Sequence, residues 1–203
     1  MDKELRTFNN CEVRAQQEDG KPASISGYGA VFNSRSNDLG GFVEVIMPGA
    51  FDDVMQDDVR ALFNHDPMYV LGRNLRTMSL SIDETGLRYE IPEVPNTQTI
   101  RDLVIEPMKR GDVTQSSFAF RVAQGGDKWY EDEEGQIVRE IHKVARLYDV
   151  SPVTYPAYEA ATSTARSLDD FKKKGENNQE LTEKRAAEQA KWRASVQREI
   201  DSI

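Results

Sequence analysis

Two adjacent serines at the start of an alternating aromatic stretch are the first residues in this chain that suggest covalent chemistry. Ser116 and Ser117 precede Phe118 and Phe120 in the segment 111–120. Side chains of an extended strand alternate between its two faces, so Ser116 shares a face with the phenylalanines and Ser117 lies on the other. Because the aromatic face should be buried, we predict that Ser116 points into the core and that a substrate can reach Ser117.

A histidine must lie near Ser117 if this serine is to react, because a hydroxyl is a weak nucleophile without an adjacent base. The chain has two, His65 and His142. His65 follows an apolar run and precedes an Asp-Pro pair, which places it where a strand becomes a loop, a common position for a working side chain. A loop histidine paired with Asp66 is nevertheless the more frequent role in such a pattern. His142 lies in a charged extended run and is typical of an exposed strand histidine.

A third group is needed to orient the imidazole and to stabilise its protonated form. Asp149 is the strongest candidate, because it interrupts the apolar run 147–153, where an acid must be paired or take part in chemistry. His142 and Asp149 are separated by an odd number of residues and would face opposite sides of a regular strand. Asp66 is the alternative partner for His65, although adjacent residues seldom bring their side chains together.

Composition and charge argue against several classes of protein. The net charge of -9 disfavours a nucleic-acid partner, since such binding relies on Lys and Arg. The single cysteine, Cys11, excludes an intramolecular disulfide and a multi-cysteine metal site, so we expect a reducing compartment and neither a metal nor a cofactor. No apolar run reaches the length of a membrane span and the first residues do not resemble a signal peptide. We therefore expect a soluble protein made in a cytoplasm.

Short alternating segments predict a sheet protein. Strands are expected at 11–15, 25–32, 42–46, 59–63, 78–82, 87–91, 115–122 and 137–153, with a helical turn at 51–55. Their number and the scarcity of helices predict a mostly β fold, with a mostly antiparallel sheet closed into a barrel or sandwich and one or two helices outside it.

One segment has the periodicity of a helix. It begins at Thr97, which can cap it, and ends at Gly111, while Pro107 should kink or shorten it. The side chains that this pattern places on one buried face are Ile100, Leu103, Val104 and Met108.

The composition changes after about Leu168, which predicts a domain at 1–168 followed by a tail at 169–203. The tail contains eight acidic and eight basic residues, so the domain carries the whole net charge. Residues 172–178 are expected to form a linker, and Trp192, Val196 and Ile200 recur every four residues, as in an amphipathic helix. Its apolar stripe is thin, which fits a detachable or partner-dependent helix, although a solvated helix is the more common case.

Three linked motifs resemble the tailed-phage prohead maturation protease family, in order and at suitable spacing over roughly residues 13–165. They are Phe63-Asn64-His65-Asp66-Pro67 with Leu71-Gly72-Arg73, Gly111 with Ser116-Ser117-Phe118-Ala119-Phe120, and Leu147-Tyr148-Asp149-Val150-Ser151-Pro152-Val153-Thr154-Tyr155-Pro156-Ala157-Tyr158. The resemblance implies a serine endopeptidase with the β-barrel fold of the herpesvirus assembly proteases. It also implies action inside the procapsid in the host cytoplasm, on the scaffolding segment of the major capsid protein and on the enzyme itself.

Carried over by motif, the family histidine falls on His65, the nucleophile on Ser117 and the acidic third member on Asp149. Two positions depart from the family pattern: Ala119 stands where a glycine is usual in Ser-Phe-Gly-Phe, and Asp149 stands where Glu is more frequent. The herpesvirus relatives use a second histidine as third member, which keeps His142 as a minor candidate. They act as dimers, so the resemblance allows a homodimer.

The resemblance implies acyl-enzyme chemistry, in which His65 takes the proton of Ser117 and Asp149 holds the imidazole tautomer. Backbone amides would receive the oxyanion, with Arg73 or Arg139 as candidate helpers, although such arginines are more often paired on the surface. Two other hypotheses stay open. The chain could be a non-catalytic assembly protein that binds capsid or scaffold through its tail, or a hydrolase acting on an ester, although no Gly-x-Ser-x-Gly elbow is present.

Overall fold

A computed structural model describes residues 3–155, 164, 168–173 and 184–185 of the chain. Its first compact unit, Met1–Ala161, contains two sheets. The larger has the order β5-β4-β11-β8-β1-β2-β7-β6 and the smaller has the order β3-β10-β9. The strands are β1 Glu4–Gln16, β2 Ser24–Val31, β3 Val43–Ile46, β4 Arg60–Phe63, β5 Asp66–Arg73, β6 Ser79–Ile82, β7 Gly86–Ile91, β8 Gln115–Val122, β9 Asp127–Glu131, β10 Ile137–Ile141 and β11 Val144–Val153.

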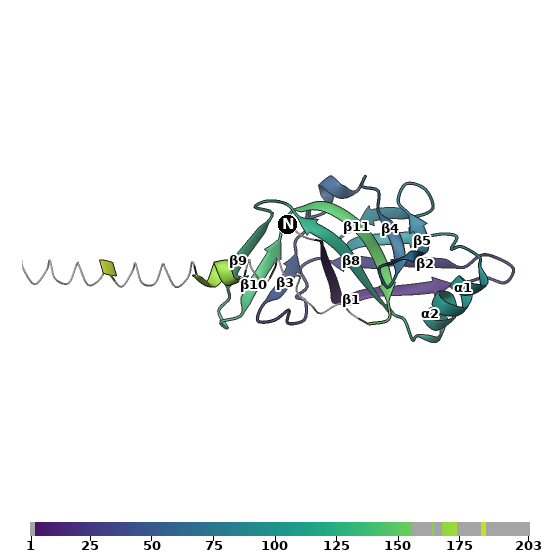
Figure 1. Cartoon of the computed structure of the whole chain (residues 1–203), viewed down its shortest axis with the longest axis horizontal. Helices are drawn as coiled ribbons and strands as arrows, with labels where there is room; N and C mark the ends of the chain where they lie inside the picture. Colours follow the sequence, from purple (N-terminus) through teal and green to yellow (C-terminus); the bar gives the residue numbers. More distant parts are fainter. Residues whose placement is uncertain (1–2, 156–163, 165–167, 174–183, 186–203) are drawn as a thin grey trace, which may run out of the picture. The chain divides into compact units, whose positions relative to one another are not determined.

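The larger sheet curls into a nearly closed barrel (Figure 1). Its two outer strands approach each other at an isolated bridge between Asn74 and Met78. A methyl group added to Gly72 would lie 3.1 Å from the Met78 side chain and 3.2 Å from Ile91, so the backbone of β5 packs directly against β6 and β7 there. The prediction of a mostly antiparallel barrel is thus confirmed in outline. Closure is incomplete, however, and the pairs β4–β11 and β3–β10 are parallel.

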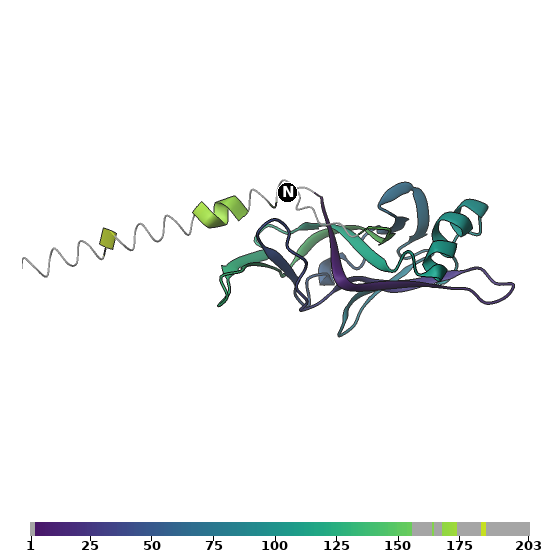
Figure 2. The same cartoon turned by 90° about the horizontal axis from the view of Figure 1, so that it is seen from below.

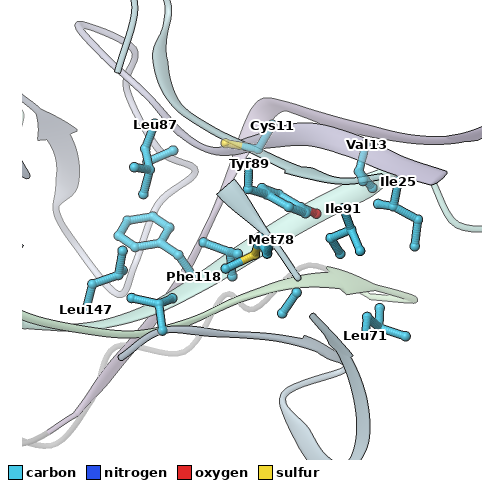
Figure 3. Close-up of a cluster of buried hydrophobic side chains, with 14 of the residues drawn as sticks. Cys11, Val13, Ile25, Leu71, Met78, Leu87, Tyr89, Ile91, Phe118 and Leu147 are labelled. Carbon is cyan, nitrogen blue, oxygen red and sulfur yellow. The ribbon is translucent and has the colours of Figure 1, made fainter. Parts of the chain in front are cut away.

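The barrel interior is filled by the aromatic face of β8, as the alternation predicts. Phe118 is buried and its ring stacks on Phe120 and Phe8, with centroids 4.7 Å and 6.2 Å away. Figure 3 shows Phe118 in a cluster with Leu87 and Leu147, contributed by β7 and β11. Burial of these apolar side chains is the main force that holds strands distant in sequence together around β8.

Strand β1 is much longer than the predicted segment 11–15. Its first residues pair with β8, so that Thr7 lies opposite Ser117 and Leu5 opposite Ala119. The register then shifts, and residues 13–16 pair with β2. The sequence did not predict this early half, because Glu4 and Arg6 resemble surface residues while the structure buries both.

An ionic cluster explains the burial of these charged side chains. The Arg6 guanidinium donates to Glu44, with Nε 2.5 Å from Oε2, and to Glu4, with Nη2 2.7 Å from Oε2. Arg139 donates to both carboxylates, at 2.8 Å to Glu4 and 2.7 Å to Glu44, and to Asp127 at 2.8 Å. Buried charges are tolerated only when they are paired and hydrogen-bonded. The cluster therefore fastens β1 to all three strands of the smaller sheet, which lies at the end of the barrel away from the helical segment 98–110 (Figure 1 and Figure 2).

The predicted helix is present, and it is built from three pieces: α1 Gln98–Ile100, the π-helical segment η2 Arg101–Ile105, and α2 Glu106–Arg110. The predicted ends are confirmed. The Thr97 hydroxyl accepts a hydrogen bond from the Ile100 amide, and Gly111 takes the left-handed conformation at φ 84°. The short helical turn predicted near 51–55 is the 3-10 turn η1 Asp52–Val54.

The wide π turn overturns one assignment of the predicted helix face. Pro107 has no amide hydrogen and its ring would clash with the carbonyl of Leu103 in a regular helix, so the turn before it opens. This opening shifts the phase of the helix. Leu103, predicted to be buried, is 48% exposed, and Ile105 is buried in its place.

Little of the predicted tail lies within the described residues. Residues 168–173 are helical, so Lys172 and Lys173 belong to a helix and not to the start of a linker. The amphipathic stripe of Trp192, Val196 and Ile200 lies outside the described residues, and the division near residue 168 stays a prediction. Among the helices that the structure describes, none is long and apolar enough to cross a membrane.

Candidate active site

His65 lies in a two-residue turn between β4 and β5. Phe63 pairs with Asp66 across this hairpin, and the two turn residues, Asn64 and His65, have φ angles of 54° and 59°. Two consecutive positive φ angles match the twist of a tight hairpin, although they are uncommon for a histidine. The sequence predicted the end of the strand correctly but not the second strand. Pro67 lies inside β5, which its position at the edge of the sheet permits.

Asn64 fixes this turn to the end of β11. Its backbone amide donates to the carbonyl of Pro152 at 3.0 Å. Its side chain donates to the Thr154 hydroxyl at 3.1 Å and accepts from the Thr154 amide at 2.8 Å. These three hydrogen bonds hold the histidine's turn against the strand that carries Asp149. Neither Asn64 nor Thr154 was predicted to position the histidine, although Asn is one of the few side chains that favour a left-handed turn position.

Ser117 and Ser116 lie on opposite faces of β8, as predicted. The Ser116 hydroxyl is inside the barrel, 3.0 Å from the Tyr89 hydroxyl, and donates to the carbonyl of Ser151. On the other face, Ser117 Oγ is 2.8 Å from His65 Nε2. The structure thus brings together a hydroxyl and an imidazole that are 52 residues apart in sequence.

The Asp149 carboxylate completes this hydrogen-bonded chain. Its Oδ1 is 2.5 Å from His65 Nδ1 and also accepts from the Ser151 hydroxyl at 2.9 Å. Its Oδ2 accepts from Lys3 Nζ at 3.0 Å. An acid is tolerated within this apolar run because both carboxylate oxygens of Asp149 are hydrogen-bonded. The contacts of Lys3 and Ser151 with Asp149 were not predicted from the sequence.

Electrostatics keep Asp149 ionised. Burial by itself would raise the pKa of its carboxyl group, but the hydrogen bond from His65 and the charge of Lys3 outweigh burial and hold the pKa below its ordinary value. A carboxylate at this position accepts the Nδ1 hydrogen and leaves Nε2 as an acceptor that faces Ser117. This is the tautomer that a general base requires.

The Ser117 hydroxyl has a second acceptor, the backbone carbonyl of Arg6 on β1, at 2.9 Å. A serine carries one hydroxyl hydrogen, so Arg6 and His65 Nε2 compete for it. Ser117 is fully buried, which corrects the prediction that a substrate reaches it directly, and the unpredicted first half of β1 lies directly beside it. The His65 side chain is 13% exposed.

The alternative site residues have other partners. His142 lies at a break between β10 and β11, so the expected continuous strand is two strands, and its Nε2 is 2.9 Å from a Glu140 oxygen. Asp66, the alternative partner of His65, accepts from the backbone amide of Met68 at 2.8 Å. The hydrogen bond to His65 is made by Asp149.

The two arginines considered for the oxyanion are also committed elsewhere. Arg73 is exposed and binds both oxygens of Asp58, at 2.7 Å and 3.0 Å, as expected of a surface pair. Arg139 is buried within the ionic cluster, which contradicts its expected surface position. The backbone amides around Ser117 therefore stay the predicted oxyanion donors.

Among the described residues, no group of three or more His, Cys, Asp or Glu side chains is arranged to hold a metal ion. Cys11 is buried, and burial raises the pKa of its thiol to about 12, so it is protonated at neutral pH. A protonated, buried thiol is a poor nucleophile. Ser117 is thus the nucleophile that the geometry favours over the single cysteine.

Comparison with known proteins agrees with this chemistry. Searches of curated proteins and of solved structures give no significant match. A family model described as caudovirus prohead serine protease matches residues 9–174, well over half of the chain. The match includes His65, Ser117 and Asp149 but begins after Lys3 and Arg6, which contact the site from just before β1 and from within it. The chain belongs to the caudovirus prohead serine protease family.

Proposed function

We propose that this protein is a serine endopeptidase in which Ser117 is the nucleophile, His65 the general base and Asp149 the carboxylate that orients it. The observation that carries the proposal is the continuous chain of contacts from Ser117 Oγ through the two nitrogens of His65 to Asp149 Oδ1, at 2.8 Å and 2.5 Å. Membership of a serine protease family supports the same assignment.

The geometry suits acyl-enzyme chemistry. As Ser117 Oγ attacks a peptide carbonyl carbon, its proton passes to His65 Nε2, and the imidazolium that forms is stabilised by Asp149. The same proton then moves to the leaving amine, which departs and leaves an ester on Ser117. Water attacks this ester, again with His65 as base, and releases the second product.

Substrate access requires a change near Ser117. The hydroxyl must turn its proton from the Arg6 carbonyl to His65, and the start of β1 must uncover Oγ so that a peptide carbonyl can approach it. Productive binding therefore includes a local displacement of residues 3–7.

The family description, a prohead serine protease, supports a role in the phage prohead. We propose that the substrate is the scaffolding segment of the major capsid protein, cleaved inside the assembling procapsid in the host cytoplasm, and that the enzyme also cleaves itself. A homodimer stays a prediction by analogy.

An active-site label tests the chemistry without knowledge of the substrate. A small fluorophosphonate should label the protein on a single peptide that contains Ser117, as read by mass spectrometry, and Ser117→Ala should abolish the label. Ser116→Ala is the matched control and should still be labelled, because its hydroxyl lies on the opposite face. Absence of labelling in the wild type, together with an uncleaved capsid protein on co-expression, would favour the non-catalytic assembly role.

A further inference from the structure

A hollow of about 320 Å³ opens beside the turn that carries His65. Its walls are mostly apolar and come from β4, β5, the segmented helix and the residues before β8: Phe63, Tyr69, Leu103, Pro107 and Val113. This volume is at the small end of the range for ligand pockets, so it suits one or two side chains and not an extended ligand.

The hollow adjoins the turn that carries the histidine of the candidate active site. Two of its polar walls are Asn64 and Thr154, the pair whose hydrogen bonds fix the histidine's turn. Ser151 lies opposite Ser117 in the sheet, and Thr154 is three residues farther along the chain. At the rise of an extended strand this separation is roughly 10 Å. An extended substrate held along the same direction would therefore place into the hollow a side chain about three residues from its scissile bond.

Leu103 is an apolar wall of the hollow that is still exposed to solvent. The π turn before Pro107 moves this leucine off the buried face of the helix, and it stays 48% exposed while lining the hollow. Phe63 and Tyr69 form the facing wall, with their rings edge to face at a centroid distance of 6.5 Å. Covering these surfaces with an apolar side chain would remove them from water, which is favourable.

The charges around the hollow limit what it can bind. Two of its lining side chains, Asp66 and Asp112, are acidic, and among the described residues that line it none is basic. Asp112 is paired with Arg110 at 3.2 Å on the exposed surface, while Asp66 accepts a backbone hydrogen bond. An acidic substrate side chain would be repelled here, and the largely apolar walls favour a neutral one over a cationic one.

We infer that this hollow is a specificity subsite that binds one large apolar side chain of the polypeptide substrate, of the size of Leu, Met or Phe, about three residues from the scissile bond. The inference rests on the proposed peptidase function, whose substrate it specifies further. Leu103 is a specificity-determining residue of this subsite.

Peptide profiling with two charge variants tests the subsite. The peptides span a capsid-protein cleavage site mapped by mass spectrometry, with each position from four before to four after the scissile bond replaced in turn by Leu, Ala, Lys or Asp. In the wild type, one position about three residues from the bond should prefer Leu over Asp in kcat/KM by roughly 10- to 100-fold, the value expected for burying one large apolar side chain. In Leu103→Glu, Leu should lose its advantage over Lys and Lys should become the best residue there, while Asp stays the poorest.

Leu75→Glu is the matched control, since Leu75 is 64% exposed and does not line the hollow. Its profile should equal that of the wild type. Thermal unfolding checks that each variant folds, and Leu75→Glu should react with a small fluorophosphonate at the wild-type rate. Leu103→Trp, which fills the hollow without adding charge, should shift the preference toward Ala and provides a second test should the glutamate variant fold poorly.

The outcomes separate the subsite from the catalytic assignment. If the wild type cleaves and is labelled, but Leu103→Glu and Leu103→Trp keep its profile, the subsite is wrong and the peptidase function stands. A wild-type preference for Lys over Leu at that position would overturn the apolar assignment. If the wild type is neither labelled nor active, the proposed function fails and the subsite fails with it.

Discussion

Two clusters of charged residues meet on the first half of β1, and they are built in opposite ways. In the ionic cluster, two arginines and two glutamates are buried and share several hydrogen bonds at once, so each charge is neutralised from more than one side. In the candidate active site, one carboxylate and one imidazole serve a single hydroxyl whose proton has two acceptors. The first arrangement holds its charged groups in fixed pairs, while the second offers one hydroxyl proton to two acceptors.

Residues at the start of β1 and just before it contact the two clusters through different groups. The Arg6 side chain anchors β1 in the ionic cluster while its carbonyl contacts Ser117, and Lys3 contacts Asp149. The anchored side chain holds β1 in the ionic cluster, and under the proposed function only the backbone beside Ser117 shifts locally when a substrate binds. Changes in the ionic cluster should therefore affect folding first, and changes in the candidate active site should affect activity first.

The largest loss of activity should come from the base. We expect His65→Ala to lower cleavage of co-expressed capsid protein by at least about 10⁴-fold, since loss of a triad histidine removes the proton acceptor. His142→Ala is the control and should leave cleavage nearly unchanged, because that histidine pairs with Glu140. Densitometry of cleaved and uncleaved capsid protein over time measures both. An equally deep loss in His142→Ala would contradict the assignment of the base.

Asp149→Asn should follow, with a loss of about 10⁴-fold in kcat, because an amide nitrogen facing Nδ1 would favour the wrong imidazole tautomer. Fluorophosphonate labelling of Ser117 should slow in parallel, whereas thermal stability should change little. Ser151→Ala is a graded control, since it removes only one of the hydrogen bonds to the same carboxylate oxygen. If Asp149→Asn labelled as fast as the wild type, the carboxylate would have no part in orienting the base.

The ionic cluster predicts a different phenotype. Arg139→Ala would leave two buried carboxylates short of a partner and should lower the free energy of unfolding by about 3 to 5 kcal/mol, measured by urea denaturation. Arg73→Ala removes a solvent-exposed pair and should change stability little. Equal stabilities for the two variants would remove the distinction between a buried anchor and a surface pair.

The free energy of unfolding measured as a function of pH also tests the role of the buried ionic cluster. Burial alone would raise the pKa of Glu44, but Arg6 and Arg139 hold it below its ordinary value of 4.5. A carboxyl group with a depressed folded-state pKa stabilises the protein above its unfolded-state pKa, and this contribution is lost as the pH falls through the folded value. The wild type should therefore lose stability steadily below pH 4.5. Glu44→Gln should be less stable at pH 7 but should show a shallower decline in urea denaturation at acidic pH.

The sequence predicted most of this architecture where local pattern and burial agree. Alternation located β8 and placed Ser116 and Ser117 on opposite faces, and capping residues located both ends of the segmented helix. The motif resemblance selected the three side chains that the structure brings within hydrogen-bonding distance, which spacing alone had left open between Asp66, His142 and Asp149. Their catalytic roles stay predictions for the experiments above.

What the sequence missed depends on contacts between distant residues. Glu4 and Arg6 look like surface side chains until Glu44 and Arg139 are brought to them, so the first half of β1 and the covering of Ser117 were not foreseen. Leu103 followed the expected helical period, but the period itself changes at the π turn before Pro107. Local propensity cannot report such effects, because they arise only after the strands and helix have packed.

The smallest effect should come from Lys3, which immediately precedes β1 and contacts Asp149. Its ammonium group helps to lower the pKa of Asp149, and it is 46% exposed, so solvent weakens its influence. Lys3→Met should raise the pKa of Asp149 toward its ordinary value, as followed by NMR titration of the side-chain carboxyl carbon, and should change cleavage by at most a few-fold at pH 7. Lys21→Met removes a lysine that pairs with Glu18 on the exposed surface and should leave the titration of Asp149 unchanged. An unshifted pKa of Asp149 in Lys3→Met would show that the Lys3 ammonium group has no part in keeping this carboxylate ionised.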